Sequence, residues 1–163
     1  LLGLMFSATI PGTIITRYEN AFAAVPLLVS FIPMLMDTGG NCGSQSSTLI
    51  IRGLALDEIK FKDIFRVIFK EFRIALLVGI GLAIANGIRI FIMYKDLKMA
   101  IVIALSLSLI VIIAKIIGCT LPLFAKKLHM DPAIMASPLI TTVVDTCSIM
   151  IYFSIATRVF TLS

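Results

Sequence analysis

The stretch that decides the fold is PAIMASPLITTVVDTCSIMIYFSIA, residues 132–156, in which Asp145 is the only charged side chain. A helix needs about 20 mostly apolar residues to cross a bilayer, so this stretch is long enough to span a membrane. A carboxylate near the centre of a bilayer costs roughly 2.5–3.5 kcal/mol on insertion scales, and it therefore normally faces a partner or a water-filled path. An ion pathway is the first hypothesis for this chain.

The composition is that of an integral membrane protein. Of the 163 residues, 60% are hydrophobic and 14% are charged, and the mean hydropathy is +1.10, whereas soluble domains carry about 25% charged residues. The length allows five spans with short connections, so we expect one transmembrane pore domain over residues 1–163 and no separate soluble domain. The chain begins inside an apolar stretch that does not resemble a signal peptide, and we expect its first span to be truncated at the N-terminus.

Several function classes are disfavoured. The net charge of +5 does not indicate nucleic-acid binding, because the basic residues lie between apolar spans, where lipid headgroups and orientation account for them. Cys42, Cys119 and Cys147 lack the close spacing of a zinc or redox motif, and we interpret them as packing residues. His129 is interpreted as a solvated loop residue. We expect no enzyme, since no nucleophile is paired with a base and no phosphate-binding loop is found.

The first two of the five predicted spans cover residues 1–15 and 21–36. The second runs into DTGGNCGSQ, residues 37–45, before apolar residues resume at 49–51. Because glycine permits backbone conformations that other residues resist, we expect the second helix to be broken near this Gly-rich segment. At membrane depth such a break must be covered by protein or line a water-filled cavity. A turn between helices at the cytoplasmic side remains the alternative, and we interpret Asp37 as a helix cap.

The other three spans follow the same periodicity. Apolar residues recur at helical spacing from Phe61 to Phe72 with basic residues on the opposite face, which predicts an interfacial amphipathic helix that continues into the third span, residues 74–88. The fourth span covers residues 99–125. The fifth begins with Asp131 as N-cap, followed by Pro132 at the first helical position, and extends to residue 158.

Lysine and arginine are unevenly divided between the two ends of these spans. One side carries eight and the other five, and because cytoplasmic loops carry the excess, the N-terminus is predicted to be cytoplasmic and the C-terminus extracellular or periplasmic. The eight are Arg52, Lys60, Lys62, Arg66, Lys70, Arg73, Lys126 and Lys127; the five are Arg17, Arg89, Lys95, Lys98 and Arg158.

Polar residues inside the spans carry the functional hypothesis. Ser137, Thr141 and Asp145 are spaced i, i+4, i+8, so they share one face of the fifth span. The hydroxyls could equally hold helices together, and Asp145 could be protonated and hydrogen-bonded in a structural role. Lys115 in the fourth span could pair with Asp145, which would favour a proton-coupled carrier, but we favour a structural ion pair or a side chain that extends toward the membrane surface.

The available ligands are carboxylate, hydroxyl, amide and carbonyl oxygens, and these suit Mg²⁺, Ca²⁺ or Mn²⁺ better than copper or zinc. Mg²⁺ gives up its waters reluctantly, so it could be held in hydrated form. One carboxylate per chain is sparse for a divalent cation. We therefore expect a symmetric homodimer with the pathway near its two-fold axis.

The sequence resembles the membrane domain of the MgtE-type magnesium channels in the order and spacing of its motifs. These are FIP (31–33), GGNCGSQ (39–45), RGLA (52–55), DPA (131–133), SPLITT (137–142), Asp145 and IYF (151–153). The family typically has glycine before the proline of the fifth span, where this chain has Ser137.

The resemblance implies a homodimer of five-span subunits in a cell membrane, with a central pore that conducts hydrated Mg²⁺ into the cytoplasm. It implies metal-site roles for Asp145 as the principal ligand, Thr141 and Ser137 along the approach, Asn41 from the second span, and Asp131 at the cytoplasmic mouth. It also implies cytosolic regulatory domains, which we expect to lie outside this sequence. Two alternatives stay open: a proton- or sodium-coupled carrier or exchanger that uses Asp145 and Lys115, and a membrane scaffold that transports nothing.

Overall fold

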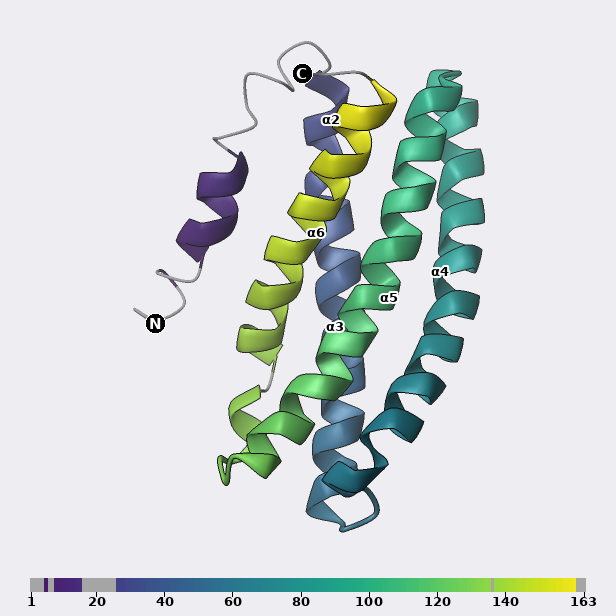
Figure 1. Ribbon diagram of the computed structural model, residues 1–163. Coiled ribbons are helices and arrows are strands. Elements are labelled where there is room, and N and C mark those ends of the chain that lie inside the picture. Colours follow the sequence, from purple (N-terminus) through teal and green to yellow (C-terminus); the bar gives the residue numbers. More distant parts are fainter. Residues whose placement is uncertain (1–4, 6–7, 16–25, 136, 161–163) are drawn as a thin grey trace.

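The computed structural model describes residues 5, 8–15, 26–135 and 137–160, and all regular elements in this part of the chain are helical (Figure 1). The long helices are α3 (Ile32–Ala55), α4 (Ile64–Tyr94), α5 (Leu97–Lys127) and α6 (Ser137–Val159). A short helix, α2 (Pro26–Ser30), precedes α3, and single 3₁₀ turns η1 (Phe61–Asp63) and η2 (Pro132–Met135) precede α4 and α6. The all-helical class is therefore confirmed.

Helix α5 is the centre of the bundle. It packs against α4 on one side and against α3 and α6 on the other, and α3 and α6 also pack on each other (Figure 1). The side chains of α5 that make these contacts, such as Ile103, Leu107 and Ile110, are fully or almost fully buried. Tyr152 of α6 is buried as well, and its hydroxyl donates a hydrogen bond to the Leu28 carbonyl of α2.

Three helical segments within the described residues are long and apolar enough to cross a membrane: Phe61–Tyr94, Leu97–Lys127 and Pro138–Val159. They match the third, fourth and fifth predicted spans. The predicted amphipathic helix and the third span are joined without interruption in α4, as the sequence indicated. Of the first predicted span, residues 8–15 are helical and most of the remainder lies outside the described residues, so five spans are not established.

The predicted break at the Gly-rich segment is wrong. Residues 37–45 lie inside the uninterrupted helix α3, and the helical run is interrupted instead at the single residue Phe31, between α2 and α3. Pro33 explains this position, because proline has no N–H to donate to the carbonyl four residues earlier, Val29 in α2, and it is tolerated in the first turn of a new helix. Asp37 is consequently an interior residue of α3 and not a cap.

The glycines of α3 allow close helix packing. A Cβ atom on Gly39 would lie 2.8 Å from Ile110 Cγ2, and one on Gly43 would lie 3.0 Å from Ile140 Cγ2. A Cβ atom on Gly118 of α5 would overlap the Gly43 carbonyl oxygen, so these two backbones are in direct contact. Small residues are typical of interfaces between membrane helices because they let the backbones approach. Tertiary packing, and not backbone flexibility, explains the GGNCG pattern.

The start of the fifth span also differs from the prediction. Asp131 Oδ1 accepts a hydrogen bond from the Ala133 N–H at 3.0 Å, so Asp131 caps the 3₁₀ turn η2 and not α6. Helix α6 begins only at Ser137. Pro138 then occupies the first turn of α6, where a missing N–H leaves no intrahelical bond unmade.

Candidate ion-binding site

Helix α3 exposes a row of polar side chains. Asp37, Asn41 and Gln45 are spaced i, i+4, i+8 on this helix, and all three are exposed in the single chain. At 1.5 Å of rise per residue the row covers roughly 12 Å along the helix axis. Because a carboxylate and two amides are costly to place against lipid, this face requires water or another protein surface.

Helix α6 brings a second set of polar groups alongside α3. Thr141 and Asp145 are one turn apart on α6 and both are half-buried. The Thr141 hydroxyl donates to the Pro138 carbonyl at 3.0 Å, as does the Thr142 hydroxyl at 2.9 Å. These bonds fix the hydroxyls against the first turn of α6, on the helix face one turn before Asp145.

The two rows meet at a cavity of about 160 Å³, which has room for several water molecules. Its lining comes from α3 and α6 alone and consists of Met36, Asp37, Gly40, Asn41, Thr141 and Asp145. The exposed side chains of Asp37 and Asn41 place its opening on the surface of the chain. Two carboxylates, one amide and one hydroxyl thus share a small hydrophilic space between two packed helices.

Gly40 makes this arrangement possible. A Cβ atom at this position would lie 3.2 Å from Thr141 Cγ2 and 3.7 Å from Asp145 Oδ1. Helices α3 and α6 therefore approach closely at the cavity, and a side chain on Gly40 would press against the threonine and occupy space beside the carboxylate. Gly40 therefore helps to form the cavity because it has no side chain to fill it.

The chemistry of the lining suits a hard cation held through water. Among the described residues no group of three or more His, Cys, Asp or Glu side chains is placed to enclose a metal ion. Two carboxylates in a cavity that admits water can instead attract a divalent cation and hydrogen-bond to its coordinated waters, which is how Mg²⁺ is commonly held.

Three of the five predicted metal-site residues line the cavity. Asn41, Thr141 and Asp145 lie together on the cavity. Asp131 is exposed beside η2 and does not line it, and the side chain of Ser137 lies outside the described residues. Binding of an ion by any of these residues remains a prediction.

Sequence reasoning missed Asp37 as a cavity residue because it placed the end of a helix there. The signal was the i, i+4 spacing of Asp37 and Asn41, which becomes visible once α3 is read as one helix. With Asp37 present, each chain supplies two carboxylates to the cavity, so the premise of a single carboxylate per chain is wrong.

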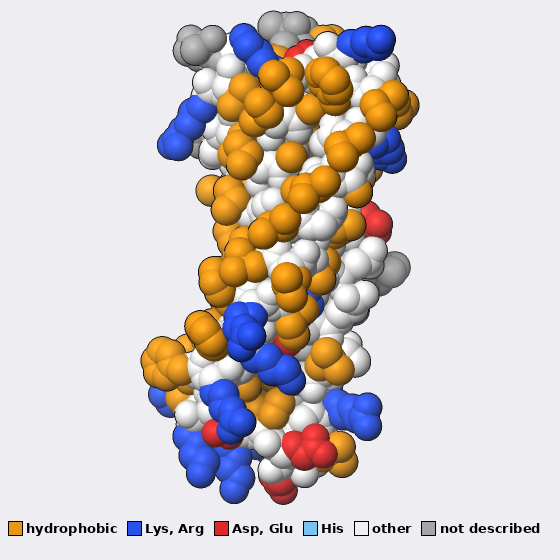
Figure 2. All heavy atoms as spheres, turned by 90° about the vertical axis from the view of Figure 1, so that its right-hand side faces the viewer, with side chains coloured by type: hydrophobic (Ala, Val, Ile, Leu, Met, Phe, Trp, Pro, Cys, Tyr) orange, Lys and Arg blue, Asp and Glu red, His pale blue; other side chains and the backbone are white. Residues whose placement is uncertain are grey.

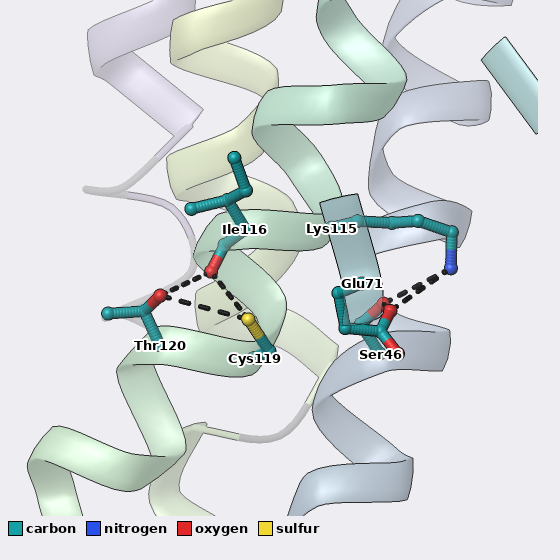
Figure 3. A network of polar contacts seen from close by, with 6 residues as sticks. All are labelled: Ser46, Glu71, Lys115, Ile116, Cys119 and Thr120. Carbon is teal, nitrogen blue, oxygen red and sulfur yellow. Dashed lines mark hydrogen bonds and ion pairs between the residues drawn. The ribbon is translucent and has the colours of Figure 1, made fainter. Parts of the chain in front are cut away.

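Lys115 is engaged elsewhere, in a buried polar cluster that joins three helices (Figure 3). Its ammonium lies 3.5 Å from Glu71 Oε2 on α4 and donates to Ser46 Oγ on α3 at 3.2 Å. The Ser46 hydroxyl in turn donates to Glu71 Oε2 at 2.7 Å. The structural ion pair favoured from the sequence is confirmed, with a partner, Glu71, that the sequence did not identify; the alternative pairing with Asp145 is wrong, and so is a side chain that extends to the surface.

Comparison with known proteins gives a consistent result. Residues 32–155 match the family model MgtE, described as a divalent cation transporter. The Magnesium transporter MgtE of Bacillus subtilis (strain 168) is 40% identical over 157 residues, which is 96% of this chain and 35% of the relative. The proteins of the same name from Thermus thermophilus and Enterococcus faecalis are 35% and 30% identical over 156 residues, in each case 96% of this chain and 34% of the relative. The chain spans about a third of the length of these curated relatives.

Proposed function

The chain belongs to the MgtE family of divalent cation transporters, and from this premise we propose that it conducts hydrated Mg²⁺ through the membrane along the face formed by α3 and α6. One observation carries the proposal: Asp37 and Asp145, from two different helices, share a small cavity with Asn41 and Thr141 between α3 and α6. Carboxylates at membrane depth are costly, and an ion pathway gives them water and a counter-ion.

Within this proposal the ligands have distinct roles. Asp145 is the principal site for the hydrated ion, and Asp37 adds a second negative charge across the cavity. Asn41 and Thr141 accept hydrogen bonds from the waters of the ion, and Ser137 extends the polar face of α6 by one turn. Asp131 precedes α6 and attracts cations at the cytoplasmic mouth. Mg²⁺ is the cargo that the names of the relatives support.

We place the pathway between two copies of the chain. The exposed row Asp37, Asn41 and Gln45 needs a hydrophilic neighbour, and a second copy related by a two-fold axis offers the same row in return. We place the N-terminus on the cytoplasmic side. The inside-negative membrane potential then drives cations toward that side by about 2.3 kcal/mol per charge per 100 mV. Regulation by cytosolic domains outside this chain belongs to the same proposal, since the curated relatives are about three times as long.

The test is Mg²⁺ uptake into liposomes that contain the purified complete protein. Asp145→Asn keeps the shape of the side chain and removes its charge, and we expect the initial rate to fall roughly tenfold or more, with a smaller loss for Asp37→Asn. Asp57→Asn is the matched control, because Asp57 is exposed outside the spans and has a φ of 55°, which asparagine tolerates.

The outcomes separate the hypotheses. Loss of uptake in Asp145→Asn with normal uptake in Asp57→Asn supports the channel. Uptake by the wild type that does not exceed that of protein-free liposomes favours the scaffold, whereas uptake that is unchanged in both variants contradicts the role given to Asp145. A dependence of uptake on a proton or sodium gradient favours the coupled carrier. Because Lys115 is paired with Glu71, such a carrier would not use Asp145 and Lys115 together as first considered.

A further inference from the structure

A second, larger cavity lies at the end of the bundle where α3 is connected to α4. Its volume is about 600 Å³, within the range of small-molecule sites. Apart from Glu71, which is paired with Lys115, its lining carries charged side chains of both signs: Arg52 from α3, Glu58 from the connecting loop, Asp63 from η1, and Arg66 and Lys70 from α4. The proposed ion pathway uses none of these five groups, and within the described residues only Asp63 takes part in the local fold.

These charges do not neutralise one another by contact. Among the described residues the Glu71–Lys115 pair is the only ion pair within 4.0 Å, so the five charged groups are arranged around the space without pairing across it. Asp63 Oδ2 accepts the Lys60 backbone N–H at 3.0 Å, a bond that leaves the carboxylate charged. A cavity with separated cationic and anionic groups is complementary to a ligand that carries both signs.

The wall that carries Glu58 is built by local backbone contacts. The N–H groups of Glu58 and Ile59 both donate to the Gly53 carbonyl, at 2.9 and 3.2 Å. A Cβ atom on Gly53 would lie 2.5 Å from Ile59 Cδ1, so the loop packs closely on α3 and the Ile59 side chain would have to shift to admit a larger residue. Asp57 reverses the chain with a φ of 55°. These contacts fix the backbone at Glu58, which lines the cavity from the connecting loop.

The surface next to the cavity is apolar and aromatic. Phe65 and Phe69 on α4 are 83% and 62% exposed, and each is followed directly by a cavity residue, Arg66 or Lys70. Figure 2, which views the molecule from the α4 side, shows a broad region of hydrophobic side chains between basic groups at the upper rim and a larger gathering of lysines and arginines on the lower part, where acidic side chains also lie. The cavity thus lies where an apolar membrane surface meets a charged one.

We propose that this cavity binds the headgroup of a zwitterionic phospholipid, phosphatidylethanolamine. The phosphate contacts Arg52, Arg66 and Lys70, which suit it because guanidinium and ammonium groups donate charge-assisted hydrogen bonds to phosphate oxygens. The primary ammonium donates to Glu58 and Asp63. The acyl chains then lie along Phe65 and Phe69 on the outside of α4.

The carboxylates of Glu58 and Asp63 are the groups that should distinguish one phospholipid headgroup from another. An anionic headgroup such as phosphatidylglycerol offers no cation for Glu58 and Asp63, so both carboxylates would be left without a partner beside the bound lipid. Phosphatidylcholine carries a cation, but its quaternary ammonium has no N–H to donate to a carboxylate. Phosphatidylethanolamine alone among these three supplies a phosphate together with a hydrogen-bonding cation.

The experiment is native mass spectrometry of the complete protein, purified in detergent and supplied with the three phospholipids with identical acyl chains. We expect phosphatidylethanolamine to be retained in preference to the other two. Arg66→Gln and Lys70→Gln should each weaken its retention roughly fivefold, the contribution of one basic residue at a membrane surface. Arg73→Gln is the control, because Arg73 lies on the same helix beside Phe69, with its guanidinium 6.0 Å from that ring, but does not line the cavity.

Glu58→Gln tests the ammonium half of the site, and we expect it to abolish the preference for phosphatidylethanolamine over phosphatidylglycerol while total lipid retention persists. Soluble phosphoethanolamine, added as a competitor, separates a lipid site from a site for a free phosphate ester. Displacement of the lipid by an equal concentration of this compound would overturn the lipid assignment, as would equal retention in Arg66→Gln and Arg73→Gln. Because Asp145→Asn should leave lipid retention unchanged, the outcome does not depend on the ion pathway.

Discussion

At the scale of single residues, the buried cluster of Lys115, Glu71 and Ser46 joins three helices through two charges that are both almost inaccessible. Removal of one partner from a buried pair typically costs about 3–5 kcal/mol, whereas exchange of both partners for neutral groups can be nearly neutral. Lys115→Met should therefore destabilise the protein strongly, and Lys115→Met combined with Glu71→Gln should recover much of the loss.

Chemical denaturation in detergent measures both variants, and Mg²⁺ uptake distinguishes a structural role from a transport role. The double variant should retain uptake if the pair only holds α3, α4 and α5 together. A stable double variant that has lost uptake would contradict this interpretation and return Lys115 to the transport mechanism. Ser46→Ala provides an intermediate case, because it removes the hydrogen bonds that Ser46 makes with Glu71 and Lys115 and leaves the charge pair in place.

At the scale of helices, the contact between α3 and α5 depends on two glycines. A Cβ atom on Gly118 would overlap the Gly43 carbonyl oxygen, so Gly118→Ala must separate the two helices. Overpacking of this kind typically costs about 1–3 kcal/mol. Gly81→Ala is the matched control, because Gly81 lies in α4 with no atom within 4 Å of the position that an alanine methyl would occupy. Alanine there should be neutral or stabilising by up to about 1 kcal/mol.

Denaturation midpoints in detergent test this pair of variants. If Gly118→Ala proves as stable as the wild type, the close approach of α3 and α5 is not required for the fold. A loss of similar size in Gly81→Ala would point to a general effect of alanine on the bundle and would contradict the packing explanation given for the GGNCG segment.

The sequence predicted the helices well where the apolar periodicity was strong. It misplaced a helix end where a glycine-rich segment and a proline both offered a position for a break. Three long helices were predicted with the correct type and approximate limits. The Gly-rich segment was taken as a break because glycine in a helix costs about 1 kcal/mol relative to alanine, but contacts with α5 and α6 override that penalty. Pro33 coincides with the interruption between α2 and α3, where the Val29 carbonyl has no N–H to accept from, although Pro122 is accommodated inside α5.

The candidate site was predicted in part for the same reason. Thr141 and Asp145 were recognised together because they lie on one helix, where spacing alone defines a face. Their relation to Asn41 was not worked out from spacing; it came from a family resemblance. The sequence did not identify Asp37 as a neighbour of Asp145 or Glu71 as the partner of Lys115. In both pairs the two residues lie on different helices and far apart along the chain, where no local spacing pattern relates them.

At the scale of the whole molecule, α3 differs from the other long helices in its polarity. It is not among the described segments apolar enough to span a membrane alone, yet it packs against both α5 and α6 in the middle of the bundle. Its polar face is therefore compatible with a bilayer only if something hydrophilic covers it. In contrast, α4 turns large apolar side chains such as Leu77 outward, as a helix facing lipid should.

This difference between two faces predicts the geometry of the proposed dimer. Gln45 lies on the exposed row of α3 outside the cavity, and Leu77, 77% exposed, lies on the apolar face of α4. In a background with Cys42, Cys119 and Cys147 replaced by alanine, Gln45→Cys should form dimers in membranes with a short bis-maleimide reagent, because two-fold symmetry brings the same row of both subunits to the pathway. Leu77→Cys should remain monomeric under identical conditions. The opposite result would place the subunit contact on α4, and Asp37 and Asp145 would then face the lipid or a different partner, which is incompatible with a pathway shared by two chains.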